Sequence, residues 1–107
     1  MKEQWKDIEG FDGKYQVSNL GRFKRINKIG EKQLIVRFDY KIPTIVLHKG
    51  GVRMEIPACK IIANAFLENP NDYKYIRYKN GYKLNNRVSN LEFVEKCSEN
   101  DVFCSAD

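Results

Sequence analysis

Hydrophobic and polar residues alternate in short runs along the first half of the chain. The runs are separated by glycine and polar breaks, a pattern typical of short β-strands joined by turns. Five such runs predict strands, at residues 14–18 (KYQVS), 21–26 (GRFKRI), 33–40 (QLIVRFDY), 44–48 (TIVLH) and 52–56 (VRMEI). We therefore expect the first half to be an antiparallel β-meander.

The hydrophobic period changes after residue 56. Within the stretch IPACKIIANAFLENP, residues of the apolar and small type recur every three or four positions, at Cys59, Ile62, Ala63 and Phe66. This spacing predicts a helix of about three turns. Pro57 suits the first helical turn, and residues 69–70 (Asn-Pro) suit the end.

The last third predicts a strand, a turn-bearing loop, a return strand and a short final helix, at 72–79, 80–86, 91–95 and 98–106, with Ser98 as the helix cap. The predicted class is α+β: an N-terminal antiparallel meander, a central helix and a C-terminal strand–loop–strand–helix unit. A chain of 107 residues suits one hydrophobic core. We expect a single domain over 1–107, with a β-rich part at 1–56 and a second part at 57–107.

Composition favours a folded protein, with 42% hydrophobic and 31% charged residues. No apolar run approaches the roughly 20 residues of a membrane span, and the N-terminus lacks a secretory signal. A cytoplasmic location is expected. The three cysteines, Cys59, Cys97 and Cys104, are an odd number without the short spacing of a metal knuckle. They are interpreted as buried or free thiols.

Positive charge is concentrated in residues 22–53, which hold nine Lys or Arg against two acids, a local net charge of +7 in a chain of +5. Such a segment is typical of a protein that binds a polyanion, most often nucleic acid. The alternative is a solvated basic surface with no ligand. The candidate nucleic-acid-binding residues here are Arg22, Lys24, Arg25, Lys28, Arg37, Lys49 and Arg53.

Three stretches resemble one protein family. Residues 5–26 (WKDIEGFDGKYQVSNLGRFKRI) resemble the nuclease-associated modular motif at the front of HNH homing endonucleases. Residues 56–70 are similar to the segment that follows in those proteins. Residues 75–95 (YIRYKNGYKLNNRVSNLEFVE) resemble their HNH, or ββα-metal, core. The resemblance covers nearly the whole chain and implies that the C-terminal unit is an HNH-like ββα unit.

The departures from the family fall on its chemistry. The resemblance implies that Arg77 stands where the family has a metal ligand and that Tyr78 stands where it has the catalytic histidine. Cys59 stands where relatives carry a second histidine. A guanidinium offers no lone pair to a metal, and a tyrosine with an ordinary pKa is only about one-thousandth ionised at pH 7. The family's last metal ligand falls on Glu99 or Asn100, both weak candidates. No cofactor is expected, and a divalent metal only if nuclease activity remains.

Other polar residues have simpler interpretations. Arg77, Tyr78, Lys79 and Lys83 form a second candidate contact with phosphate and sugar, or else an ordinary polar strand surface. The lone histidine, His48, is expected to be structural or solvent-facing. The loop asparagines are expected to fix the loop by bonding its backbone: Asn85, Asn86 and Asn90.

Three functions follow from the resemblance. The first is a catalytically inactive, HNH-endonuclease-derived DNA-binding protein of phage or mobile-element type, in a bacterial or phage-infected cell. The second is a phage-type inhibitor that binds a host or defence protein through the retired fold. The third is residual metal-dependent DNA nicking. The partner is expected to be DNA, or a host protein in the second case, and an oligomer remains open.

Overall fold

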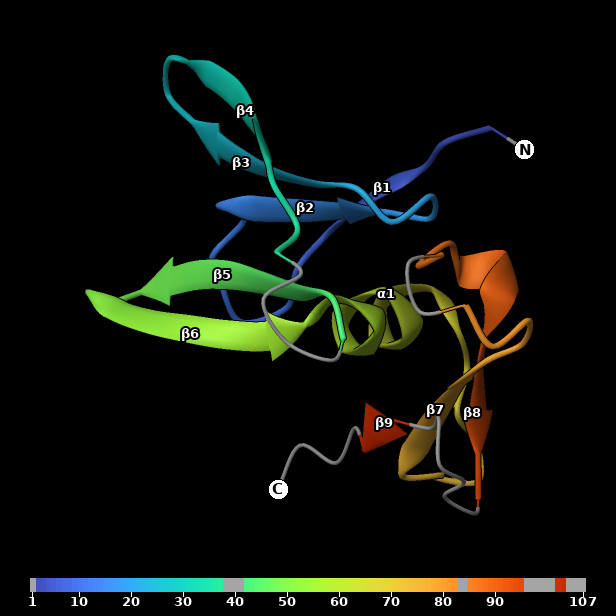
Figure 1. Ribbon diagram of the computed structural model, residues 1–107. Coiled ribbons are helices and arrows are strands. Elements are labelled where there is room, and N and C mark those ends of the chain that lie inside the picture. The colour runs from blue at the N-terminus through green and yellow to red at the C-terminus, as the bar shows by residue number, and fades with distance from the viewer. Residues whose placement is uncertain (1, 38–41, 83–84, 96–101, 104–107) are drawn as a thin grey trace.

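The computed structural model describes residues 2–37, 42–82, 85–95 and 102–103, which form three antiparallel sheets around a helix (Figure 1). The α+β class is confirmed. In the first half the elements are β1 (Trp5–Asp7), β2 (Tyr15–Ser18), β3 (Phe23–Asn27), β4 (Gly30–Leu34), β5 (Thr44–Lys49) and β6 (Val52–Pro57). In the second half they are α1 (Ala58–Phe66), β7 (Tyr75–Tyr78), the 3-10 turn η1 (Val88–Asn90), β8 (Leu91–Val94) and β9 (Val102–Phe103).

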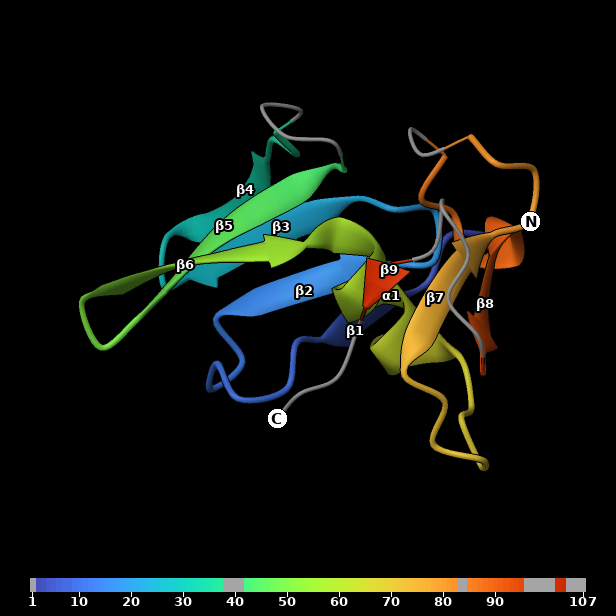
Figure 2. The same cartoon turned by 60° about the horizontal axis from the view of Figure 1, so that its bottom comes forward.

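The N-terminal meander divides into two sheets. Strands β1 to β4 pair in consecutive order, and β5 and β6 form a separate hairpin. The phenol oxygen of Tyr15 accepts the backbone N–H of His48 at 3.1 Å, which ties the first sheet to the second. The hairpins β3–β4 and β5–β6 extend to one side of the molecule, while β7 and β8 lie at the other (Figures 1 and 2).

Helix α1 lies between the first sheet and the β7–β8 pair and carries the centre of the core. Its buried residues are Ala58, Cys59, Ile62 and Ala63. They pack with Val17 and Phe23 of the first sheet, Leu47 of the hairpin, and Ile76 and Leu91 of the last sheet, all at most 1% exposed. Cys59 is buried, one of the two states expected for the cysteines. Among the described residues no helix is long and apolar enough to cross a membrane.

Two predicted strand boundaries need correction. The strand expected at 33–40 differs over its described part, because β4 begins at Gly30 and ends at Leu34; residues 38–40 lie outside the described residues. Ile35 is 83% exposed, so the apolar run beyond Leu34 is not a buried strand. Arg37 makes only an isolated bridge to Thr44. Strand β1 and the turn η1 were not predicted.

The expected helices also differ from the structure. Helix α1 ends at Phe66, and Asn69 instead closes a turn with the backbone of Tyr73. The prediction of a final helix at 98–106 is wrong at residues 102 and 103. Val102–Phe103 form strand β9, which pairs with β7. Valine and phenylalanine favour strands, and β7 offers them an edge. The rest of that predicted helix, including Ser98 and Cys104, lies outside the described residues, and so does Cys97.

Candidate nucleic-acid interface and degenerate nuclease site

Tyr78, where the family resemblance implies a histidine, is a core residue. On β7 the side chains of Ile76 and Tyr78 are buried, whereas Tyr75 and Arg77 are half-buried on the other face. The Tyr78 hydroxyl donates a hydrogen bond of 2.9 Å to Oδ1 of Asn86. Burial, and then the charge and hydrogen bonding of the neighbouring Cys59, raise the pKa of Tyr78 well above its usual value. The phenol is therefore neutral at physiological pH and cannot act as a general base.

This geometry corrects one site prediction. Tyr78 was a candidate contact for phosphate and sugar, or else part of a polar strand surface, but only 3% of it is exposed and its hydroxyl donates to Asn86. Tyr78 and Cys59, which stand at the two histidine positions of the resemblance, are neighbours in the structure. They form a sealed contact in the core and present no reactive group to the surface.

Asn85 and Asn90 of the following loop bond its backbone, as expected, whereas Asn86 Oδ1 accepts from the Tyr78 hydroxyl. Asn90 accepts the Asn80 N–H at 3.1 Å, and its amide donates to Oδ1 of Asn80 at 3.1 Å and to the Asn85 carbonyl at 3.0 Å. Asn80 Oδ1 also accepts the Tyr82 N–H at 2.8 Å, and Asn85 Oδ1 accepts the Arg87 N–H at 3.3 Å. These side chains fix the backbone of residues 80–82 and 85–87, between β7 and η1.

This loop packs directly on the N-terminal motif. The Val88 N–H donates to the carbonyl of Asn19 at 2.9 Å. A Cβ placed on Gly21, whose φ is +88°, would lie 3.1 Å from the carbonyl oxygen of Asn86. Gly21 thus permits both the turn and the close approach of the two loops. The two family motifs therefore meet at the residue that engages Tyr78.

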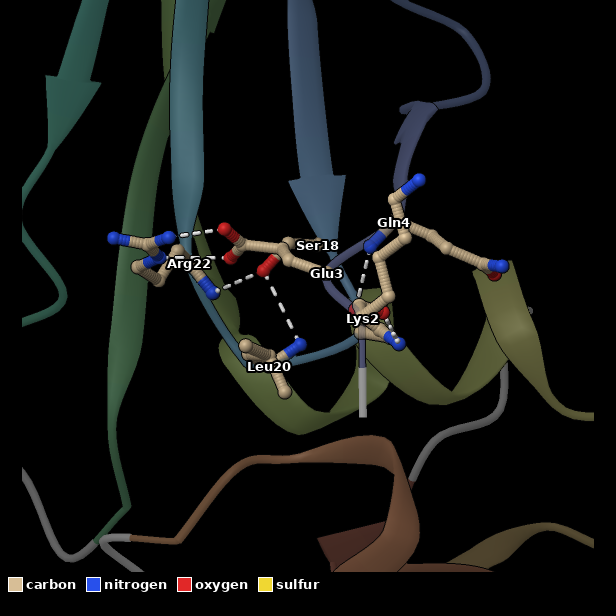
Figure 3. Close-up of polar contacts among 7 residues, drawn as sticks. Lys2, Glu3, Gln4, Ser18, Leu20 and Arg22 are labelled. Atoms are coloured by element: carbon tan, nitrogen blue, oxygen red, sulfur yellow. Dashed lines mark hydrogen bonds and ion pairs between the residues drawn. The ribbon is translucent and has the colours of Figure 1, made fainter.

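The turn after β2 is held by a polar network (Figure 3). Ser18 Oγ accepts the N–H groups of Leu20 and Arg22 at 3.2 and 3.1 Å. Both carboxylate oxygens of Glu3 accept from the Arg22 guanidinium, with a distance of 2.7 Å from Nε. This pairing lowers the pKa of Glu3 and raises that of Arg22. Arg22 is thus partly neutralised by a bidentate carboxylate.

Trp5 lies outside the buried core and is half-buried. The Nζ of Lys24 is 4.3 Å from the centre of its ring, and the guanidinium carbon of Arg22 is 6.0 Å away. Lys24 also pairs with Glu31 at 3.0 Å, and only 17% of its side chain is exposed. Two of the expected DNA-binding cations therefore rest on an aromatic ring and carry their own acidic partners.

Within the described ranges, exposed cations without an acidic partner lie further along the β3–β4 hairpin. Arg25, Lys28 and Lys32 are all exposed. Arg25 lies directly opposite Lys32 in the strand register, a like-charge pair that destabilises a sheet by itself. Lys32 was counted in the basic segment but was not singled out as a contact. Lys32 becomes a candidate contact because it lies opposite Arg25 in the strand register. That register is known only from the structure.

The remaining candidates are dispersed. Lys49 is exposed at the end of β5, 5.9 Å from the ring of Phe11, and Arg53 pairs with Glu55 at 2.8 Å. His48 is exposed, which agrees with one of its two expected roles. Arg37 is exposed beside Thr44.

The second expected cluster lies at the far end of the molecule from these hairpins (Figures 1 and 2). Arg77 lies opposite Glu92 in the register, and Lys79 is exposed. Arg87, also exposed, is a basic residue near this loop that the sequence analysis did not single out. Lys83, Glu99 and Asn100 lie outside the described residues. Among the residues that are described, no three His, Cys, Asp or Glu side chains are grouped to hold a metal ion.

These two motif regions and their packing agree with the comparisons, which make the chain a relative of the HNH homing endonucleases with a NUMOD4 motif at residues 3–48. One relative is the DNA endonuclease I-HmuI of Bacillus phage SP01, which is 37% identical over 93 residues. Two HNH endonucleases of Acanthamoeba polyphaga mimivirus are 30% and 36% identical over 94 and 102 residues.

The alignments cover most of this chain but only part of each relative. They include 85% of the chain and 52% of I-HmuI, and 88% and 92% of the chain against 28% and 25% of the mimivirus proteins. The solved structure of I-HmuI, an HNH homing endonuclease that binds and cleaves DNA, superposes with a TM-score of 0.76 at 35% identity. It covers 85% of this chain and 52% of that one, so the chain spans about half the length of the phage enzyme.

Proposed function

We propose that this chain binds duplex DNA and does not cut it. The observation that carries the second half of the proposal is the burial of Tyr78 against Asn86 and Cys59. A nuclease of this family type needs a base that reaches the attacking water and oxygen or nitrogen ligands that hold a metal. A neutral phenol in the core does not supply the base, and Arg77, the residue before it, does not supply a metal ligand.

The DNA-binding half rests on the relatives and on charge. I-HmuI binds DNA, and 85% of this chain superposes on part of I-HmuI. The exposed cations Arg25, Lys28 and Lys32 lie on one two-stranded hairpin, from which they can contact the phosphate backbone. Phosphates would relieve the repulsion between Arg25 and Lys32. The alternative, a protein partner for the retired fold, does not require such a like-charge pair.

A salt titration tests the DNA-binding half. The affinity for a mixed-sequence duplex should fall steeply with salt, because each phosphate contact releases counterions and contributes about 0.9 to the logarithmic slope. Replacing Arg25, Lys28 and Lys32 by Ala should weaken binding and reduce that slope by up to about three. The matched control replaces Arg22 and Lys24, which are paired with Glu3 and Glu31, and should change the slope less.

Two outcomes would count against this proposal. If the wild-type protein does not bind duplex DNA even at low salt, the protein-binding alternative is favoured. If the hairpin triple variant retains the wild-type slope, the β3–β4 hairpin is not the docking surface.

A further inference from the structure

The tip of the β3–β4 hairpin carries an apolar side chain that the turn does not require. Asn27 pairs with Gly30, so Lys28 and Ile29 form a two-residue loop. Asn27 Oδ1 accepts the N–H groups of Ile29 and Gly30, each at 2.9 Å, and Gly30 has a φ of +153°. Asn27 and Gly30 therefore define the turn. The side chains at 28 and 29 are available for another purpose.

Ile29 is the most exposed large hydrophobic residue among those described, at 96%. It belongs neither to the core nor to the residues packed against it. The hairpin projects from the remainder of the sheet, so Ile29 stands at its outer end (Figure 1). An isoleucine has few rotamers, so little side-chain entropy is lost when it enters a tight space.

The surroundings of Ile29 indicate the partner. Three exposed cations share its hairpin: Arg25, Lys28 and Lys32. A protein partner would favour a continuous apolar patch, whereas a single apolar tip among cations matches the pattern by which DNA-bending proteins place a wedge against a base step. The cations would hold the phosphates on either side of the step.

From this geometry we infer that Ile29 is a wedge that inserts at a base-pair step of bound duplex DNA and kinks it. The inference rests on the DNA binding proposed above. Wedge residues of this kind partly unstack one step and bend the duplex by about 20–90°. Pyrimidine–purine steps unstack most easily, so the wedge would favour TA and CA steps over stiff A-tracts.

The experiment compares Ile29→Ala with two matched variants. Ile35→Ala removes another isoleucine that is 83% exposed but lies past the end of β4, and Ile29→Leu keeps an apolar wedge. Each protein is tested for affinity to a mixed-sequence duplex across a salt series. Bending is measured as the rate at which ligase closes a short duplex into a circle, and unstacking as the fluorescence of 2-aminopurine placed at TA steps.

Ile29→Ala should lower affinity about threefold to tenfold, leave the salt slope unchanged, and abolish both faster circle closure and the 2-aminopurine signal. Ile35→Ala should match the wild type, and Ile29→Leu should keep most of each effect. Binding by Ile29→Ala with wild-type affinity and bending would overturn the wedge while leaving DNA binding intact. No binding by the wild type would instead remove the proposed function and the wedge together.

Discussion

The hydroxyl of Tyr78 is the group on which we expect both the stability of the fold and the proposed absence of cleavage to depend. It is buried, it donates to Asn86, and it lies beside the Cys59 thiol. Asn86 belongs to the loop that packs on Gly21. A histidine in a nuclease site must exchange protons with water, whereas this phenol stabilises a junction between two motifs. In this chain Tyr78 therefore has a structural role.

Removing that hydroxyl should destabilise the fold without affecting DNA binding. Tyr78→Phe keeps the ring but takes the 2.9 Å donor away from buried Asn86, which should cost about 1–2 kcal/mol in the free energy of unfolding. Urea denaturation measures this change. Tyr82→Phe is the control, because Tyr82 is 57% exposed and its loss should be close to neutral. Equal effects from the two variants would mean that the Asn86 contact contributes nothing.

The same residue should give the fold an alkaline limit. Tyrosine in an unfolded chain has a pKa near 10, and burial raises the pKa of Tyr78 in the folded protein. Above about pH 10 the unfolded state releases a proton that the folded state retains, so stability falls as pH rises. Tyr78→Phe should lose stability less steeply above pH 10. An identical alkaline slope in wild type and variant would show that Tyr78 does not contribute to it.

The contact between the two motif loops can be tested by a matched pair of glycines. Gly21 and Gly13 have φ values of +88° and +74°, so either substitution by Ala incurs about 1–2 kcal/mol of backbone strain. A Cβ on Gly21 also approaches Asn86, whereas nothing lies within 4 Å of one on Gly13. Gly21→Ala should therefore be the more destabilising in urea denaturation. Equal losses would indicate that the loops do not touch there in solution.

Sequence patterns predicted the elements whose residues have a strong local preference. Strands β2, β3, β5 and β6, helix α1, and the β7–β8 pair were found because their apolar residues follow a clear period. The errors fall where local preference does not decide. Ile35 is apolar yet exposed, and Val102 pairs with Ile76 of a distant strand. Pairing partners and exposure depend on the whole fold, and a single sequence does not display them.

The same limit applies to the site. The sequence and the family resemblance identified Tyr78 and Cys59 as altered positions, but burial and the Asn86 contact reversed the expectation that Tyr78 touches DNA. The charge count located the basic segment. It could not separate cations with acidic partners, such as Arg22 beside Glu3, from the exposed like-charge pair of Arg25 and Lys32.

At the scale of the molecule, α1 and the Asn86 loop join the two parts, 1–56 and 57–107, and we propose that they unfold as one domain. Trp5, the single tryptophan, reports on the first sheet by fluorescence, and amide exchange in Ile76 reports on the last one. Both should give the same free energy of unfolding, because the parts share one core. A lower value for β7 alone would mean that the second part unfolds independently.

The central claim is our proposal that this relative of the HNH homing endonucleases binds duplex DNA and does not cleave it. It is tested most directly by one titration of supercoiled plasmid with magnesium or manganese, in which binding and nicking are scored on the same samples. We predict a retarded plasmid that stays supercoiled at every protein concentration, because the base is a buried neutral phenol. Metal-dependent nicking by the wild-type protein that disappears in Tyr78→Phe would contradict the account and make Tyr78 a catalytic residue.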